Sequence, residues 1–532
     1  MPVNTAALKS FAPAMRRQLI EAVGRKLDLL LTSQTPDTLS TYAKQIAELR
    51  EQAAQSREQL LEQVAYSWFN RLAALRYLDA KGWHPFGCRV LMPAGGGETQ
   101  PELLKLMRSG SLPIELKEHT NENRLNGLLD GQIPTAIAGA DPQGEVYREL
   151  VLAVCHSYHQ LLPNLFEGLD DATELLLPDD QITDGSIAGA FRSQISDDDC
   201  EDVEIIGWLY QFYISEKKDQ VIGKVVKSED IPAATQLFTP NWIVKYMVQN
   251  SLGAQWLATY PSSDLKGLME YYIEPAEQTE EVKAQLAAIT PEALNPEDLT
   301  LIDPACGSGH ILVEAYELFK AIYLERGYQQ REIPKLILEK NLFGLDIDER
   351  AAQLTSFALM MKGRGDDRRL FERGIQLNVM ALVNSDGLDL EALANAVNLG
   401  DHGLKLADLV ELKQLFEHAT TFGSLIQVPD GLAKKLPALR RLSELKGQGM
   451  FVAEALNCLE PLVRQAELLA ARYDDVVANP PYMGSKAMNT SVKKFAKDHY
   501  PDGKSDLFAC FIQRGCELSK DGGRNASITM DS

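Results

Sequence analysis

The sequence predicts an α/β protein in which a helical N-terminal region precedes a domain built on a mostly parallel sheet. Two observations lead to this fold class. Over residues 1 to about 80, apolar side chains recur at three- and four-residue spacing, as on the buried face of amphipathic helices. From Leu299 onward, short apolar runs that end in acidic or Gly/Pro turns alternate with helical patterns. That alternation is typical of a parallel sheet with helices on both faces, whose ligands bind at the carboxyl ends of the strands.

The change of pattern divides the 532 residues into two regions. We expect helices over residues 1–230 and the sheet domain over residues 231–532, with insertions near 276–298 and 386–470. Within the sheet domain, the expected strands are Leu299–Ile302, Leu342–Leu345, Asp475–Ala478 and Ala526–Thr529.

The composition excludes several classes of protein. The 53 basic and 75 acidic residues give a net charge of −22, which excludes a globally basic nucleic-acid clamp but allows a local basic groove. A hydrophobic share of 45% and a charged share of 24% exclude disorder as the dominant state. The seven cysteines form no CxxC pair and no zinc-like cluster with histidine, so we expect no disulfide framework and no metal site. Neither a secretory signal nor an apolar run of the roughly 20 residues that a membrane helix needs is visible, so we expect a cytoplasmic protein without membrane contact.

A strand, a Gly-rich turn and a helix are expected in succession at 301–310. Asp303 ends the strand, and Pro304-Ala305-Cys306-Gly307-Ser308-Gly309 forms the turn. Gly307 and Gly309 allow a positive φ and let the backbone pass close to a ligand. Many turns contain glycine without binding a ligand. This Gly-rich turn, however, directly follows a strand that ends in an acid, which favours a site for a nucleotide-type cofactor.

A second apolar run, Phe343-Gly344-Leu345, also ends in an acid, Asp346. A carboxylate at a strand end can accept hydrogen bonds from both ribose hydroxyls, as in dinucleotide-binding folds. The neighbouring Ile347 can pack against an adenine ring. An ordinary acidic turn is the alternative, but the preceding Gly-rich turn favours a cofactor site.

The most specific motif is Asn479-Pro480-Pro481-Tyr482, which follows the apolar run 475–478. The two prolines fix φ, remove two backbone donors and hold the preceding residues extended. The side chain of Asn479 and the carbonyl near Pro480 are then rigid acceptors beside an aromatic ring. Two acceptors suit a planar substrate that carries an NH₂ group, and Tyr482 offers a stacking face.

These motifs resemble those of S-adenosylmethionine-dependent amino-methyltransferases that act on DNA adenine. Upstream, Phe238-Thr239-Pro240-Asn241-Trp242 resembles the motif that precedes the Gly-rich turn in the gamma-ordered members, and Asp506-Leu507-Phe508 resembles a later one. The resemblance implies a Rossmann-like methyltransferase domain with S-adenosylmethionine as cofactor. The resemblance places Thr239 and Pro240 at the methionine end of the cofactor and Asp346 and Ile347 on its ribose and adenine. The residues that it places along the cofactor are Asp303, Pro304, Ala305, Gly307 and Gly309. The third family motif is an acid near the adenine amine of the cofactor, and our candidate for it is Asp386. The resemblance also assigns Asn479, Pro480, Pro481 and Tyr482 to the flipped target base.

A closer resemblance extends along nearly the whole chain. The segments Leu8–Pro13, Ala65–Arg71 and Glu204–Tyr213 resemble the PglX-type methyltransferases of BREX phage-defence systems. This resemblance implies site-specific N6-adenine methylation that marks host DNA as self. Family members are considerably longer, so we expect residues 231–532 to lack the last two strands and the target-recognition region.

The same resemblance implies the partners. They are double-stranded DNA with a flipped adenine, other BREX proteins and phage-encoded DNA mimics that act as antagonists. Two basic clusters are candidates for phosphate contact, at 486–506 and at 431–447, although both could equally be solvated helix faces. Direct transfer of the methyl group to the amine is expected, without a metal and without Cys306 as a nucleophile.

Four alternatives remain open. The Glu115-Leu116-Lys117 triplet has the E-x-K core of a Mg²⁺ nuclease, as in a restriction-modification fusion enzyme. The modification subunit of a type I-like restriction-modification system has a similar length and motif order. Protein-glutamine methyltransferases also use Asn-Pro-Pro-Tyr, but lack the long helical region. The fourth alternative is a scaffold that keeps the fold and binds DNA without catalysis.

Overall fold

The computed structural model describes residues 5–32, 36–95, 97–135, 141–163, 165–166, 171–236, 239–445 and 450–529. The chain forms two compact units, residues 1–216 and 217–532. Phe238 and Lys446, which belong to the sequence motifs above, lie outside the described residues.

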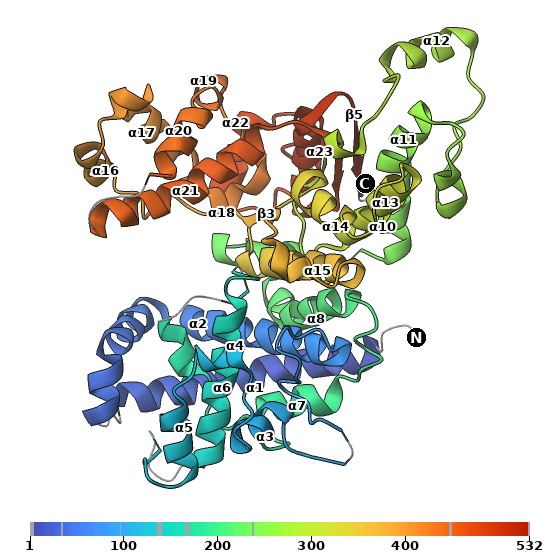
Figure 1. Ribbon diagram of the computed structural model, residues 1–532. Helices are drawn as coiled ribbons and strands as arrows, with labels where there is room; N and C mark the ends of the chain where they lie inside the picture. The colour runs from blue at the N-terminus through green and yellow to red at the C-terminus, as the bar shows by residue number, and fades with distance from the viewer. Residues whose placement is uncertain are drawn as a thin grey trace. The chain divides into compact units, whose positions relative to one another are not determined.

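The first unit contains helices and no strand among its described residues, as the apolar periodicity predicts (Figure 1). Two long helices, α1 and α2, pack together through buried residues such as Leu19, Leu27 and Leu72. The helices are α1 (Thr5–Thr32), α2 (Pro36–Lys81), α3 (Glu102–Arg108), α4 (Ile114–Lys117), α5 (Glu122–Leu129), α6 (Pro142–Tyr158), α7 (Ile187–Gln194), α8 (Glu204–Val221) and a 3-10 turn, η1 (Ala172–Leu176).

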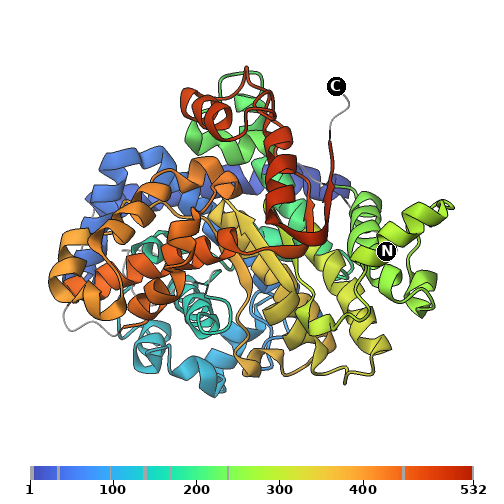
Figure 2. The ribbon, with the colours of Figure 1, turned by 90° about the horizontal axis from the view of Figure 1, so that it is seen from above.

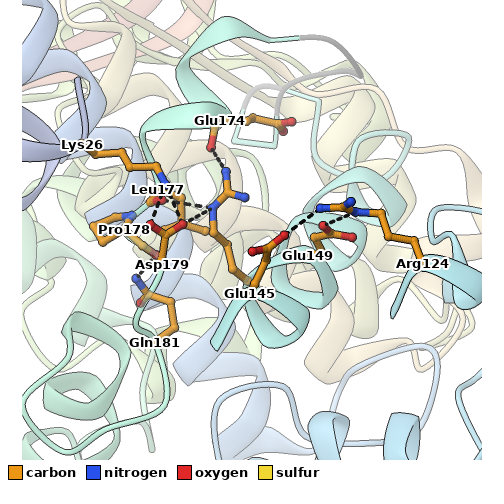
Figure 3. Close-up of polar contacts among 10 residues, drawn as sticks. Lys26, Arg124, Glu145, Glu149, Glu174, Leu177, Pro178, Asp179 and Gln181 are labelled. Carbon is orange, nitrogen blue, oxygen red and sulfur yellow. Dashed lines mark hydrogen bonds and ion pairs between the residues drawn. The ribbon is translucent and has the colours of Figure 1, made fainter. Parts of the chain in front are cut away.

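A network of charged side chains ties α1 and α5 to α6 and the segment after η1 (Figure 3). The ammonium of Lys26 lies 2.6 Å from both carboxylate oxygens of Asp179. Arg124 pairs with Glu145 at 2.7 Å and with Glu149 at 2.9 Å. Burial lowers the pKa of Lys26. Since a buried charge is tolerated only when it is paired, Asp179 provides the partner that Lys26 needs.

The second unit contains a five-stranded parallel sheet in the order β3-β2-β1-β4-β5. The strands are β1 (Leu301–Asp303), β2 (Leu342–Asp346), β3 (Asn378–Ala381), β4 (Tyr473–Ala478) and β5 (Ser519–Ser527). The predicted parallel sheet is therefore confirmed, and the expected runs at 299–302, 342–345 and 475–478 coincide with β1, β2 and β4 to within two residues at either end. The run expected at 526–529 overlaps only the end of β5, which begins at Ser519. No strand was expected at β3.

Helices cover both faces of this sheet (Figure 2). One face packs against α13 (His310–Glu325) and α15 (Glu349–Asp366). On the other face, Ile302, Leu345 and Val476 pack against leucines of the segment that was expected to be an insertion near 386–470. That segment forms α16 (Leu390–Ala396), α17 (Leu406–Leu415), α18 (Ala419–Phe422), α19 (Asp430–Ala433), α20 (Leu436–Ser443) and α21 (Met450–Ala470). The segment is thus part of the core of the unit.

The second unit contains seven further helices in its described residues. They are α9 (Ile231–Thr235), α10 (Asn241–Val248), α11 (Ala254–Thr259), α12 (Glu280–Ile289), α14 (Ile333–Leu336), α22 (Thr490–His499) and α23 (Leu507–Leu518). Short 3-10 or π turns are η2 (Ser228–Asp230), η3 (Gln249–Gly253), η4 (Asp264–Leu268), η5 (Pro296–Asp298), η6 (Ile337–Asn341), η7 (Leu370–Arg373), η8 (Leu399–His402) and η9 (Gly423–Leu425). Helix α12, in the expected insertion near 276–298, has no buried residue. Among the described residues, no helix has both the length and the apolar character needed to cross a membrane.

Candidate functional site

The Gly-rich turn lies at the carboxyl end of β1 and leads into α13. Gly307 and Gly309 have φ angles of +53° and +88°, which residues other than glycine rarely adopt. A Cβ on Gly309 would lie 2.9 Å from Oγ1 of Thr355, so the turn also requires glycine for space. The Thr355 hydroxyl in turn donates to the Gly307 carbonyl at 2.7 Å. The turn is therefore held in one conformation by α15.

The structure brings this turn and Asp346 together. The backbone N–H of Gly307 donates to Oδ2 of Asp346 at 2.8 Å, and the N–H of Asp348 donates to Oδ1 at 2.8 Å. The N–H of Cys306 donates to the Leu345 carbonyl at 2.9 Å. The two motifs that the sequence separates by about forty residues thus form one continuous surface at the ends of β1 and β2.

Two carboxyl groups at this edge have raised pKa values. Burial raises the pKa of Asp303 to about 8, and the nearby charge of Asp346 acts in the same direction. Burial raises the pKa of Asp346 to about 6, although the N–H groups of Asp348 and Gly307 oppose that shift. At neutral pH, Asp303 is therefore mostly protonated and can donate a hydrogen bond, while Asp346 is mostly an acceptor.

The Asn-Pro-Pro-Tyr segment follows β4 at the same edge of the sheet. The side-chain amide of Asn479 donates to the hydroxyl of Thr239 at 2.8 Å. The hydroxyl of Tyr482 donates to Oδ1 of Asn479 at 3.1 Å. Thr239 is buried, whereas Asn479 and Tyr482 are half-buried. The amide of Asn479 is therefore fixed from both sides while its surface remains accessible.

Asp506 holds the next part of the loop in place. Its carboxylate accepts from the N–H of Met483 at 3.0 Å and from the N–H of Phe508 at 3.3 Å, where it caps α23. The ring of Phe508 lies 5.8 Å from that of Tyr482. The segment 506–508, singled out as a later family motif, thus lies directly against the Asn-Pro-Pro-Tyr segment.

Sequence reasoning missed one part of this edge, the segment 423–426. Ser424 is buried and its hydroxyl donates to the Pro304 carbonyl at 2.6 Å. A Cβ on Gly423, whose φ is +59°, would lie 3.0 Å from Cγ2 of Ile347. The guanidinium of Arg514 donates to the carbonyls of Ser424 and Ile426 at 2.9 and 3.0 Å. A Gly-Ser pair that neither follows an expected strand nor adjoins an acid provides no pattern that would have identified this segment.

Asp386, our third-motif candidate, lies apart from these contacts. It is exposed, five residues after the end of β3. In the described part of the chain its carboxylate has no hydrogen bond or ion pair. The neighbouring Asn384 accepts from the N–H and hydroxyl of Thr420 at 3.0 and 3.1 Å. The role of Asp386 at the cofactor adenine stays a prediction.

A cavity of about 660 Å³ lies elsewhere in the second unit. Its lining includes Asp474, near the start of β4, and Lys520 and Arg524 of β5, together with residues of α11 and α12. Because the strands are parallel, this region is remote from the strand ends that carry Asp303, Asp346 and Asn479. None of the predicted site residues lines it.

Comparisons with known proteins agree with the motifs. Residues 340–532 match the family model described as Eco57I restriction-modification methylase. The adenine-specific methyltransferase BrxX of Escherichia coli O9:H4 (strain HS) is 46% identical over an alignment 576 positions long, which covers 100% of this chain and 47% of that protein. The adenine-specific methyltransferase PglX of Lacticaseibacillus casei (strain Zhang) is 33% identical over an alignment 584 positions long, which covers 99% of this chain and 47% of that protein.

Among solved structures, the type IIL restriction-modification enzyme MmeI in complex with DNA has a TM-score of 0.38 at 14% identity, covering 97% of this chain and 49% of that one. The modification subunit of a type I restriction enzyme from Vibrio vulnificus YJ016 has a TM-score of 0.28 at 13% identity, covering 96% of this chain and 70% of that one. The sequence relatives are the stronger comparison, and the chain spans about half the length of those it matches. The resemblance of this chain to the PglX-type adenine-specific methyltransferases is thus confirmed along its whole length.

Proposed function

We propose that the second unit methylates the N6 amine of adenine in DNA, with S-adenosylmethionine as the methyl donor. The observation that carries this proposal is the position of Asn479, held by Thr239 and Tyr482 at the end of β4. The Gly-rich turn and Asp346 lie at the ends of the two neighbouring strands of the same sheet. The relatives named BrxX and PglX support adenine as the target.

The residues at the ends of β1 and β2 fit the proposed cofactor. The carboxylate of Asp346 accepts two backbone N–H groups and keeps further lone pairs for ribose hydroxyls. The space where a Cβ of Gly307 would stand is open, so a ligand can approach the backbone there. Bound S-adenosylmethionine supplies an electrophilic methyl group. The residues proposed to hold it are Thr239, Pro240, Asp303, Pro304, Ala305, Gly307, Gly309, Asp346, Ile347 and Asp386.

The residues after β4 would receive the target base. Oδ1 of Asn479 and the carbonyl of Pro480 are the proposed acceptors for the two amine hydrogens, which aims the nitrogen lone pair at the methyl group. Pro481 keeps this backbone rigid. The ring of Tyr482 would stack on the base, a contact of about 1–3 kcal/mol, and so help to offset the few kcal/mol that flipping costs.

The biological role follows from the same relatives. We infer that the methylation marks host DNA as self within a BREX defence system, in which the protein meets other BREX proteins and can be a target of phage-encoded DNA mimics. A nuclease role for Glu115 and Lys117 has no support, because Lys117 forms an ion pair with Glu122 at 3.1 Å. Glu115 and Lys117 are both exposed.

The direct test uses the purified full chain with DNA and S-adenosylmethionine that carries an isotopically labelled methyl group. Nucleoside mass spectrometry should find the label on N6-methyladenine, and Asn479→Ala should abolish it. Asn398→Ala, which removes an exposed cap of η8, is the matched control and should retain activity. Label on cytosine or on protein glutamine, or activity that persists in Asn479→Ala, would refute the proposal.

A further inference from the structure

Five lysines lie close together in the segment that follows the Asn-Pro-Pro-Tyr motif. Lys486, Lys493, Lys494, Lys497 and Lys504 are all exposed. In the described part of the chain, none of their ammonium groups has an ion pair or hydrogen bond. Three of them lie on α22, on the side opposite Val492 and Ala496, which are buried. We call these three, Lys493, Lys494 and Lys497, the lysine face.

The other basic cluster, at 431–447, is partly engaged with its own surroundings. Arg440 pairs with Glu444 at 3.0 Å and with Glu460 at 3.2 Å. Lys435 donates to the Gly403 carbonyl at 3.1 Å. The sequence made the two clusters equivalent candidates, and these contacts of Arg440 and Lys435 favour the lysines at 486–506 as the more available group.

The lysine face is also firmly attached to the site. Val492, Ala496 and Tyr500 belong to the same buried cluster as Met483 and Leu507. Met483 directly follows Tyr482, and its backbone N–H donates a hydrogen bond to Asp506. The Asn-Pro-Pro-Tyr loop and α22 therefore share one core. On the other side of α22, Phe495 stacks on Phe422 with ring centroids 4.1 Å apart.

The segment before α9 also contacts the start of α22. The N–H of Val226 donates to the Ala487 carbonyl at 2.8 Å, and Asn489 donates to the hydroxyl of Ser228 at 3.3 Å. The start of α22 is therefore held from the segment before α9 as well as from the Asn-Pro-Pro-Tyr loop. A ligand on the lysine face would be placed at a defined position relative to Asn479.

We propose that the lysine face binds the phosphate backbone of the DNA that flanks the flipped base. This inference rests on the proposed function for the identity of the substrate. The ten residues of α22 span about 15 Å, and duplex DNA carries one charge per roughly 1.7 Å, so about nine phosphates lie within that length. Asp498 and Asp502 are exposed nearby, and Asp506 is engaged at the loop, so the segment keeps an excess of positive charge.

This local excess matters because the whole chain carries a net charge of −22. Polyanionic DNA is repelled by most of such a surface and is attracted where lysines gather. Contacts to phosphates fix the orientation of a duplex without reading its sequence. The lysine face would therefore position any duplex with one strand toward Asn479.

The test compares two double charge reversals in the full chain. Lys493→Glu with Lys497→Glu changes the lysine face, and Lys434→Glu with Arg441→Glu makes the same change of net charge in the other cluster, at exposed residues. Binding of a fluorescent duplex of random sequence is measured over a series of salt concentrations, together with binding of S-adenosylmethionine. Random sequence suffices, since phosphate contacts do not depend on sequence.

The lysine-face variant should bind the duplex at least about tenfold more weakly at low salt, and its salt dependence should fall by about 0.9 in log–log slope per lost contact. The control variant should bind as the wild type does, and both should bind the cofactor normally. Equal DNA affinities of the two variants would overturn the proposal. That result is the one expected if the lysine face binds an acidic protein and not DNA. A wild type that binds DNA through the lysine face but does not methylate adenine would refute the proposed function and leave this inference standing.

Discussion

The side-chain amide of Asn479 donates a hydrogen bond to the hydroxyl of Thr239, 2.8 Å away in space and 240 positions earlier in the chain. Because the amide nitrogen faces Thr239, Oδ1 faces Tyr482 and the accessible side of the loop. In the proposed reaction this oxygen accepts the amine of the target base. Thr239 therefore acts as a positioning residue for the acceptor, in addition to its proposed place beside the cofactor.

Replacing Thr239 with Val should release the Asn479 amide. A lost hydrogen bond of about 1 kcal/mol predicts a methyl-transfer rate that is about fivefold to tenfold lower in single-turnover kinetics. Thr239→Ser keeps the hydroxyl and should restore most of the rate. The positioning role would be contradicted if the Val and Ser variants had the same rate constant.

Gly309→Ala should both destabilise the unit and weaken cofactor binding. The added Cβ meets Thr355 at 2.9 Å, and φ is +88°, so a cost of about 1–3 kcal/mol is expected in urea unfolding. Gly431→Ala is the matched control, because nothing lies within 4 Å of its Cβ position and its φ is not positive. That variant should be neutral or slightly stabilised. Equal unfolding midpoints for the two variants would show that the turn is not constrained as described.

Ser424→Ala should weaken binding of S-adenosylmethionine severalfold, measured by calorimetry. It removes the hydroxyl that donates to the Pro304 carbonyl and so loosens the wall beside Ile347. Ser443→Ala is the control, since its buried hydroxyl also donates to a backbone carbonyl, that of Arg440, at 2.9 Å. If both variants bound the cofactor as the wild type does, the segment 423–426 would have no part in the site.

The pH dependence of stability should change in Asp303→Asn. The folded-state pKa of Asp303, about 8, lies above the ordinary value of 3.8, so the folded state holds a proton that the unfolded state releases. Its contribution is fully present below pH 3.8 and is lost as the pH rises toward 8, by up to about 1.4 kcal/mol per pH unit. Urea unfolding at several pH values should therefore show a stability difference, variant minus wild type, that grows from pH 5 to pH 8. A constant difference would mean that Asp303 is ionised throughout.

Much of the sheet could be predicted from the sequence because its central strands are short apolar runs that end in an acid, in β1 and β2, or before Asn479-Pro480, in β4. Strand β3 was missed because its apolar residues, Val379 to Ala381, do not end in an acid as those of β1 and β2 do. Strand β5 was recognised only at its end, since its first residues, Ser519 to Arg524, are polar at the sheet edge. Apolar periodicity cannot identify a strand that buries so little.

The candidate site follows the same division. Local motifs identified the Gly-rich turn, Asp346 and Asn479, because each has its own backbone requirement. The bond between Thr239 and Asn479 and the contact of Ser424 with Pro304 join residues far apart in the chain, and only the fold brings them together. The sequence also provided no reason to prefer one basic cluster, and only the fold shows ion pairs such as that of Arg440 with Glu460.

The central claim is that Asn479 holds a DNA adenine for methylation. It is tested most directly by sequencing host DNA for N6-methyladenine in cells that carry the wild-type full chain or Asn479→Ala, with Asn398→Ala as the control. We expect one short DNA motif to be methylated in the wild type and the control, and unmethylated with Asn479→Ala. The same methylation in all three strains would contradict the claim.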